Sequence, residues 1–188
     1  MGKGESFERQ ICRQLSVWWS KGQAEDIFWR NRTRRTAKTP NAERQLGDLR
    51  ADKLNGMALI STFNIELKTG YSKTKKGKRV KNIPWDLLDL IDGKQHKFLE
   101  FWEQTITDAE LSNRFPMLIF KRDYHSPIIT LRKDNLNKFR EYLGDTPKII
   151  TLNVILKDLE TLQLFNLDDF LSWFSPEVVK MYVNVKKK

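Results

Sequence analysis

Cysteine and histidine are scarce in this 188-residue sequence, which contains one cysteine and two histidines. A single cysteine, Cys12, excludes an internal disulfide and a zinc site built from several cysteines. His96 and His125 are too few for a multi-histidine metal centre. A metal-dependent reaction would therefore rely on carboxylates and water, a donor set that favours magnesium or manganese.

Long apolar segments are also missing. No apolar run approaches the ~20 residues that a membrane-spanning helix needs, and residues 1–5 lack the apolar stretch of a signal peptide. We therefore expect a cytoplasmic protein that does not enter a membrane. The sequence also has no glycine-rich phosphate loop of the Gly-x-x-x-x-Gly-Lys type, and no serine or cysteine nucleophile with an evident histidine base.

Positive charge is abundant: 34 Lys and Arg residues against 24 Asp and Glu residues give a net charge of +10. Hydrophobic residues make up 39% of the chain, which is enough for a buried core. The excess of cations predicts a polyanionic partner, and we expect this partner to be DNA. The predicted DNA contacts are the arginines Arg30, Arg32, Arg34 and Arg35 and the lysines Lys73, Lys75 and Lys76.

Hydrophobic periodicity predicts alternating helices and strands in one domain. The predicted helices span 5–20, 84–91, 94–113, 133–143 (capped by Gly144) and 168–174. The predicted strands span 47–54, 57–69, 116–121, 128–131, 148–156 and 162–165, the first two joined by a tight turn at Asn55-Gly56. This order predicts an α/β or α+β sheet flanked by helices. Gln104 and Asp108 lie off the apolar arc of helix 94–113, where they face either DNA or water.

An acidic pair with a lysine is the most informative pattern in the sequence. Asp48 follows Gly47, while Glu66 and Lys68 alternate with the apolar residues of the segment Phe63-Asn64-Ile65-Glu66-Leu67-Lys68. Successive side chains of a strand point to opposite faces, so Glu66 and Lys68 lie side by side while the apolar set faces a core. Two carboxylates beside an ammonium suit a hard cation held against a phosphodiester, which indicates nucleic-acid cleavage.

Each of these residues also has an ordinary structural interpretation. Asp48 could serve only as a turn residue, and Glu66 with Lys68 could form an ion pair on a solvated strand face. Glu8 lies within the inward arc of the N-terminal helix, where an acid is costly unless it is paired or binds a metal. A buried salt bridge to an arginine near residue 30 is therefore open for Glu8, and metal binding, direct or through water, is the interpretation we favour.

In this order, the residues resemble the PD-(D/E)XK nuclease superfamily, which includes restriction endonucleases and Holliday junction resolvases. The matching segments, within residues 3 to 131, are Phe7-Glu8-Arg9, Gly47-Asp48 and Ile65-Glu66-Leu67-Lys68. The resemblance implies a restriction-endonuclease-like mixed sheet flanked by helices. It implies Glu8, Asp48, Glu66 and Lys68 as catalytic residues. It also implies Mg²⁺ or Mn²⁺ held by Asp48, Glu66, the Leu67 carbonyl and Glu8.

The resemblance also implies an activity. We expect a metal-dependent DNA endonuclease like small phage-encoded members, structure-selective in the manner of a junction resolvase and homodimeric if it resolves junctions. A restriction-type enzyme that reads a sequence and an inactive DNA-binding module are the alternatives, and an RNA substrate stays open. We expect a nuclease core over residues 1–131, with residues 132–188 as a C-terminal extension packed on the same domain.

Overall fold

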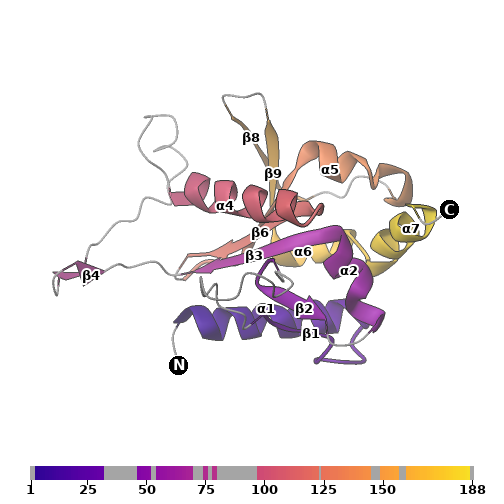
Figure 1. Cartoon of the computed structure of the whole chain (residues 1–188), viewed down its shortest axis with the longest axis horizontal. Helices are drawn as coiled ribbons and strands as arrows, with labels where there is room; N and C mark the ends of the chain where they lie inside the picture. The colour runs from indigo at the N-terminus through magenta and orange to yellow at the C-terminus, as the bar shows by residue number, and fades with distance from the viewer. Residues whose placement is uncertain are drawn as a thin grey trace.

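A five-stranded mixed sheet organises the fold (Figure 1). The computed structural model describes residues 3–31, 46–51, 54–69, 74–75, 78–79, 97–122, 124–144, 149–156 and 160–186. In spatial order, the strands of the sheet are β3 (Phe63–Thr69), β6 (Phe115–Lys121), β7 (Ile128–Arg132), β9 (Thr161–Asn166) and β8 (Thr151–Ile155). β3 and β6 run parallel, whereas the other neighbours pair antiparallel. The predicted α/β class, with a sheet flanked by helices, is confirmed.

Two short antiparallel pairs lie outside this sheet. β1 (Phe28–Arg30) pairs with β2 (Leu49–Ala51), and β4 (Thr74–Lys75) pairs with β5 (Lys78–Arg79). The helices are α1 (Lys3–Trp19), α2 (Met57–Thr62), α4 (Lys97–Leu111), α5 (Lys133–Asn137), α6 (Leu167–Trp173) and α7 (Pro176–Lys186), with 3-10 turns η1 (Leu54–Gly56) and η2 (Arg140–Tyr142). Within the described part of the chain, no helix has the length and apolarity to cross a membrane.

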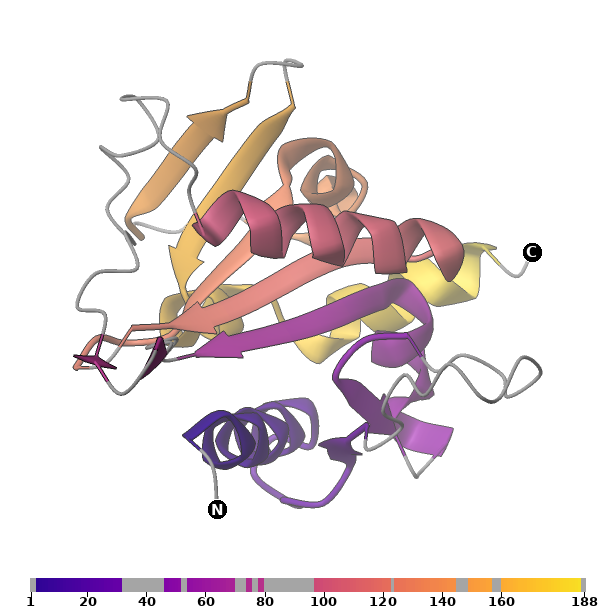
Figure 2. The same cartoon turned by 60° about the vertical axis from the view of Figure 1, so that its left-hand side comes forward.

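Helices cover both faces of the sheet. Figure 2 shows α4 lying across one face, with α6 and α7 behind the other and α1 beside β3. On the α4 face, Phe98, Phe101 and Trp102 pack with Leu118, Leu162 and Leu164. The opposite face carries the larger core, into which β3 contributes its alternate apolar residues. β3 is therefore buried on both faces, and its polar side chains lie under α4 instead of in solvent.

The predicted hairpin of strands 47–54 and 57–69 is wrong. Residues 57–62 form α2 instead of a strand, and β2 pairs with β1 instead of with β3. Met57, Ala58 and Leu59 are good helix formers, and short apolar runs fit either period. Gly56 has a φ of −84°, and a Cβ there would come within 2.8 Å of Ala51 and of Ile27. This glycine thus allows close packing and does not form the predicted tight turn.

The C-terminal third differs from the prediction in two places. The helix predicted over 133–143 is split into α5 and η2, and Phe139 between them is fully buried. Leu143 ends η2 in an extended conformation, so the predicted Gly144 cap is wrong. The helix α7 was not predicted, although Pro176 at its start is a favourable first helical residue. β9 and β8 complete the sheet that begins at β3, and the predicted division at residue 131 stays a prediction.

Candidate functional site

The site is built where the Gly47-Asp48 segment lies against the edge of β3 that faces away from β6. The amide of Asp48 donates to the Ile65 carbonyl at 2.8 Å, and the Leu67 amide donates to Oδ2 of Asp48 at 2.7 Å. On its other side, the Asp48 carbonyl accepts from the Asn31 amide at 2.7 Å. These bonds fix the Asp48 carboxylate beside the strand that carries Glu66.

Gly47 permits this close approach. Its φ of +89° lies in the left-handed region that favours glycine. A Cβ at this position would come within 2.9 Å of Oδ1 of Asn64 and 3.1 Å of the Ile65 carbonyl oxygen. The glycine before Asp48 is thus required by both conformation and space, and Asp48 is more than a turn residue.

Glu66 and Lys68 of β3 form a hydrogen-bonded group with Gln104 of α4, the helix that covers this face of the strand. Nζ of Lys68 donates to Oε1 of Glu66 at 2.5 Å, and Nε2 of Gln104 donates to the same oxygen at 3.1 Å. Glu66 is 4% and Lys68 8% exposed, so the interpretation as a solvated ion pair is wrong. The Lys68 ammonium also lies 5.6 Å from the centroid of the Phe101 ring, which adds a cation–π contact.

The surroundings of Asp48 disfavour its ionised form. Its pKa is raised to about 7, chiefly by burial and secondly by the negative charge of Glu66. The Leu67 amide and the Lys68 ammonium oppose this rise but do not cancel it. A buried pair of like charges is a place where an added cation would lower the free energy.

Glu8 forms the salt bridge that the sequence left open. Nε of Arg30 donates to Oε2 of Glu8, and Nη1 of Arg30 lies 2.7 Å from Oε1 of Glu5. The same contact lowers the pKa of Glu5. The charge of Glu8 still raises the pKa of Asp48, as the last of its contributions. The role of Glu8 at a metal therefore stays a prediction, and so does DNA contact by Arg30, whose side chain is 20% exposed and bonded to two acids.

Most of the predicted DNA contacts lie outside the described residues. These are Arg32, Arg34, Arg35, Lys73 and Lys76. Lys75 is described only as backbone in β4. Their roles stay predictions.

Sequence reasoning did not identify Gln104 as part of the site. Gln104 lies off the apolar arc of the helix, and that arc does not show which strand residue lies opposite. The neighbouring suggestion that Asp108 faces DNA or water is wrong, because Asp108 is 5% exposed. Asn64, two residues before Glu66 on the same face, was also missed. It is fully buried, and neither amide atom has a hydrogen-bond partner among the described residues.

The oxygen donors fit a hard divalent cation. The carboxylates of Asp48 and Glu66 and the backbone carbonyl of Leu67, the residue after Glu66 in β3, are the ligand types that such ions prefer. In the described ranges, no cluster of three or more His, Cys, Asp or Glu side chains is present. Two carboxylates and a backbone carbonyl are thus the protein ligands that this part of the structure offers, and oxygen ligands of this kind are the ones that a hard divalent cation binds.

The chain matches a model of a known protein family. A family model described as "Phage putative PDDEXK endonuclease" matches residues 1–180. The match covers nearly the whole chain, including every residue of the group described above. No curated protein and no solved structure matches the chain.

Proposed function

The chain belongs to the phage PDDEXK endonuclease family, and from this premise we propose that it is a metal-dependent DNA endonuclease acting at Asp48, Glu66 and Lys68. One observation carries the proposal: three residues separated by up to 20 positions are brought together through the strand β3. Leu67 bonds Asp48 at 2.7 Å, and Lys68 bonds Glu66 at 2.5 Å. The restriction-endonuclease-like fold of the protein and its net charge of +10 suit a nucleic-acid substrate.

Asp48, Glu66 and the Leu67 carbonyl would hold the divalent ion, Mg²⁺ or Mn²⁺, with Glu8 joining through water. The resemblance to the PD-(D/E)XK superfamily implies a divalent metal, and the like-charge repulsion between Asp48 and Glu66 supports binding here. When bound, such an ion polarises a phosphoryl oxygen and lowers the pKa of water.

The other groups of the site have distinct tasks. The Lys68 ammonium is the cation that would orient the attacking water or offset the charge that develops on the phosphate. Gln104 orients the Glu66 carboxylate by donating to Oε1. Glu66 in turn holds Lys68 in place. Hydrolysis at this site would leave a 5′-phosphate and a 3′-hydroxyl.

We also propose that the enzyme selects its DNA substrate by structure. The most specific version of this proposal is a preference for four-way junctions. Phosphate contacts by basic residues give affinity without reading bases, and the excess of cations supports recognition of this kind. Symmetric cutting of a junction would require a homodimer.

A substrate panel tests this proposal. Supercoiled plasmid, linear duplex, single strand, RNA and a four-way junction would be incubated with Mg²⁺ or Mn²⁺. The controls are EDTA, the Glu66→Ala variant and a Glu103→Ala variant that removes an exposed acid from α4. We expect cleavage that both EDTA and Glu66→Ala abolish, with the junction cut fastest. Equal rates on duplex and junction would overturn the structural selectivity, and a preferred duplex sequence would indicate a restriction-type enzyme. DNA binding without any cleavage would indicate an inactive module.

A further inference from the structure

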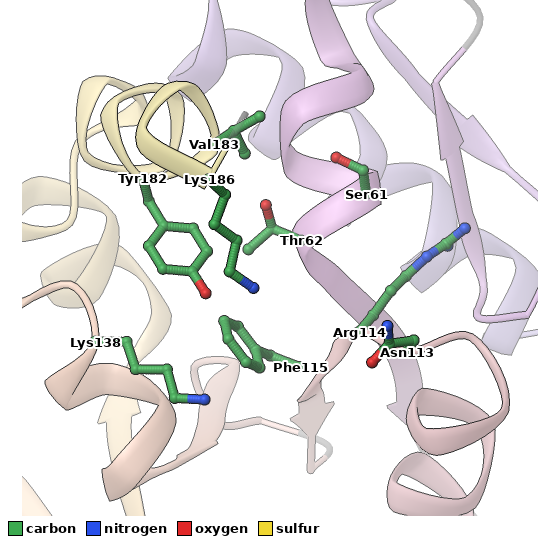
Figure 3. A pocket seen from close by; sticks show the side chains of 9 residues that line it. All are labelled: Ser61, Thr62, Asn113, Arg114, Phe115, Lys138, Tyr182, Val183 and Lys186. Carbon is green, nitrogen blue, oxygen red and sulfur yellow. The ribbon is translucent and has the colours of Figure 1, made fainter. Parts of the chain in front are cut away.

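A polar pocket lies at the end of β3 that is opposite to Lys68 (Figure 3). It has a volume of about 330 Å³ and is enclosed by the ends of α2, α4 and α7, the start of β6 and the turn after α5. Phe115 at its floor pairs in register with Phe63, the first residue of β3. Lys68 lies five residues farther along that strand, roughly 17 Å away at ~3.3 Å per residue. The pocket is therefore separate from the site described above.

Positive charge is concentrated in this pocket. Lys138, Lys186 and Arg114 line it, and no Asp or Glu of the described residues is among the lining groups. The ammonium of Lys138 lies 4.7 Å, and that of Lys186 5.6 Å, from the centroid of one shared ring, Phe115. In Figure 3 the Phe115 ring lies between the two ammonium groups, so this ring carries positive charge on both sides. An anion that enters the pocket would be attracted by both.

Hydrogen-bond donors and an aromatic surface accompany the charge. In Figure 3, Lys186 and the hydroxyl of Tyr182 point toward the space above Phe115, whereas Arg114 extends to the side. Lys186 also lies in the last turn of α7, where a cation offsets the helix dipole. Its ammonium, however, lies over the rings of Phe115 and Tyr182, which directs it into the pocket.

We propose that this pocket binds a phosphate ester, with Lys186 and the Tyr182 hydroxyl on the phosphate and Lys138 adding positive charge from the other side of the Phe115 ring. Lysine is a common phosphate ligand, and a tyrosine hydroxyl can donate to a phosphate oxygen. The volume is at the lower end of the ~300–1,000 Å³ of small-molecule sites, which suits one nucleotide. The phosphate can come from a mononucleotide or from a nucleic-acid chain. The proposal does not depend on the nuclease function.

Calorimetry in EDTA tests the pocket without cleavage. A deoxynucleoside 5′-monophosphate and a short single-stranded oligonucleotide form the two arms, and the unphosphorylated nucleoside is the ligand control. The proteins are the wild type, the double variant Lys138→Gln/Lys186→Gln, and the matched double variant Lys133→Gln/Arg140→Gln. The last removes two exposed cations that do not line the pocket. Circular dichroism would verify that each variant is folded.

We expect the pocket double variant to bind at least tenfold more weakly in one arm, and the matched variant to lose less than threefold. Loss in the mononucleotide arm assigns the pocket to nucleotides, and loss only in the oligonucleotide arm assigns it to a nucleic-acid chain. The proposal is overturned if the wild type binds neither ligand, if both double variants lose affinity equally, or if the nucleoside binds as tightly as its monophosphate. Failure here would leave the nuclease proposal intact, because that proposal is judged by cleavage.

Discussion

The Leu67 amide donates a hydrogen bond to Oδ2 of Asp48 at 2.7 Å, so the strand that carries Glu66 also positions the second acid. One residue on, Lys68 bonds Glu66 at 2.5 Å. Three consecutive residues of β3 thus organise the acids and the cation of the proposed active site. The same arrangement places two carboxylates in a partly desolvated site, which has a measurable cost.

Replacing Asp48 with Asn should stabilise the protein in EDTA at pH 8. Burial and Glu66 raise the pKa of Asp48 to about 7 in the folded chain, against an ordinary value of 3.8. The folded state therefore binds the proton more tightly, and stability falls as pH rises from about 4 to 7. Removing the charge should raise the free energy of unfolding by roughly 2 kcal/mol, and by no more than about 4 kcal/mol. Denaturant-induced unfolding at pH 4 and pH 8 measures this change.

The exposed Asp134 provides the control for this experiment. An Asp134→Asn variant should show no comparable gain at pH 8. If Asp48→Asn lowers stability equally at both pH values, then the ionised Asp48 carboxylate is not a source of destabilisation. In the same unfolding experiments, added Mg²⁺ should raise the free energy of unfolding of the wild type and leave that of Asp48→Asn nearly unchanged. A ligand stabilises only the protein that binds it.

Replacing Lys68 with Gln should slow single-turnover cleavage by about 10²-fold or more, while DNA affinity changes little. An ammonium that offsets charge developing on the phosphate contributes mainly to the transition state. Lys97 is the matched control, since its ammonium also lies 5.6 Å from the Phe101 ring but pairs with Glu100. Equal losses in Lys68→Gln and Lys97→Gln would assign Lys68 a packing role only.

Replacing Gln104 with Ala should reduce cleavage about 10-fold to 100-fold, the usual effect of removing a residue that orients a metal ligand. Gln104 is exposed, so the melting temperature should hardly change. A Thr107→Ala variant, exposed on the same helix, should keep full activity. The Mg²⁺ concentration that gives half-maximal cleavage should rise in Gln104→Ala; an unchanged metal dependence would contradict the positioning role.

Replacing Gly47 with Ala should destabilise the fold by ~1–3 kcal/mol. The φ of +89° disfavours a side chain, and the added Cβ would meet Asn64 and the Ile65 backbone. Cleavage should fall as well, because the next residue is Asp48. Gly144→Ala is the comparison, as nothing lies within 4 Å of a Cβ there. Melts that show equal stability for the two variants would contradict this account of Gly47.

Residue periodicity alone predicted how Glu66 and Lys68 meet. Strand alternation placed them on one face, and the same alternation sent Phe63, Ile65 and Leu67 into the core. The proximity of Asp48 followed from the resemblance, since the predicted hairpin that would have brought it near is wrong. The catalytic roles of all three residues stay predictions.

Other features depend on contacts that periodicity does not encode. The short, mostly apolar segment from Met57 to Thr62 is compatible with either a helix or a strand. In the folded protein it is a helix, and tertiary packing accounts for this choice. Gln104 and Asp108 are one helical turn apart and looked equivalent, yet one donates to Glu66 and the other is buried. The preference of Glu8 for Arg30 likewise required the pairing of β1 with β2, which brings residues 28–30 beside α1.

Nicking of supercoiled plasmid is the measurement that tests the central claim most directly. Wild type, Glu66→Gln and the matched exposed variant Glu103→Gln would be compared in Mg²⁺ and in EDTA, under single-turnover conditions. We predict metal-dependent nicking by wild type and Glu103→Gln, and a loss of at least ~10³-fold in Glu66→Gln. Undiminished nicking by Glu66→Gln, or nicking that persists in EDTA, would show that the Asp48–Glu66–Lys68 group is not the active site.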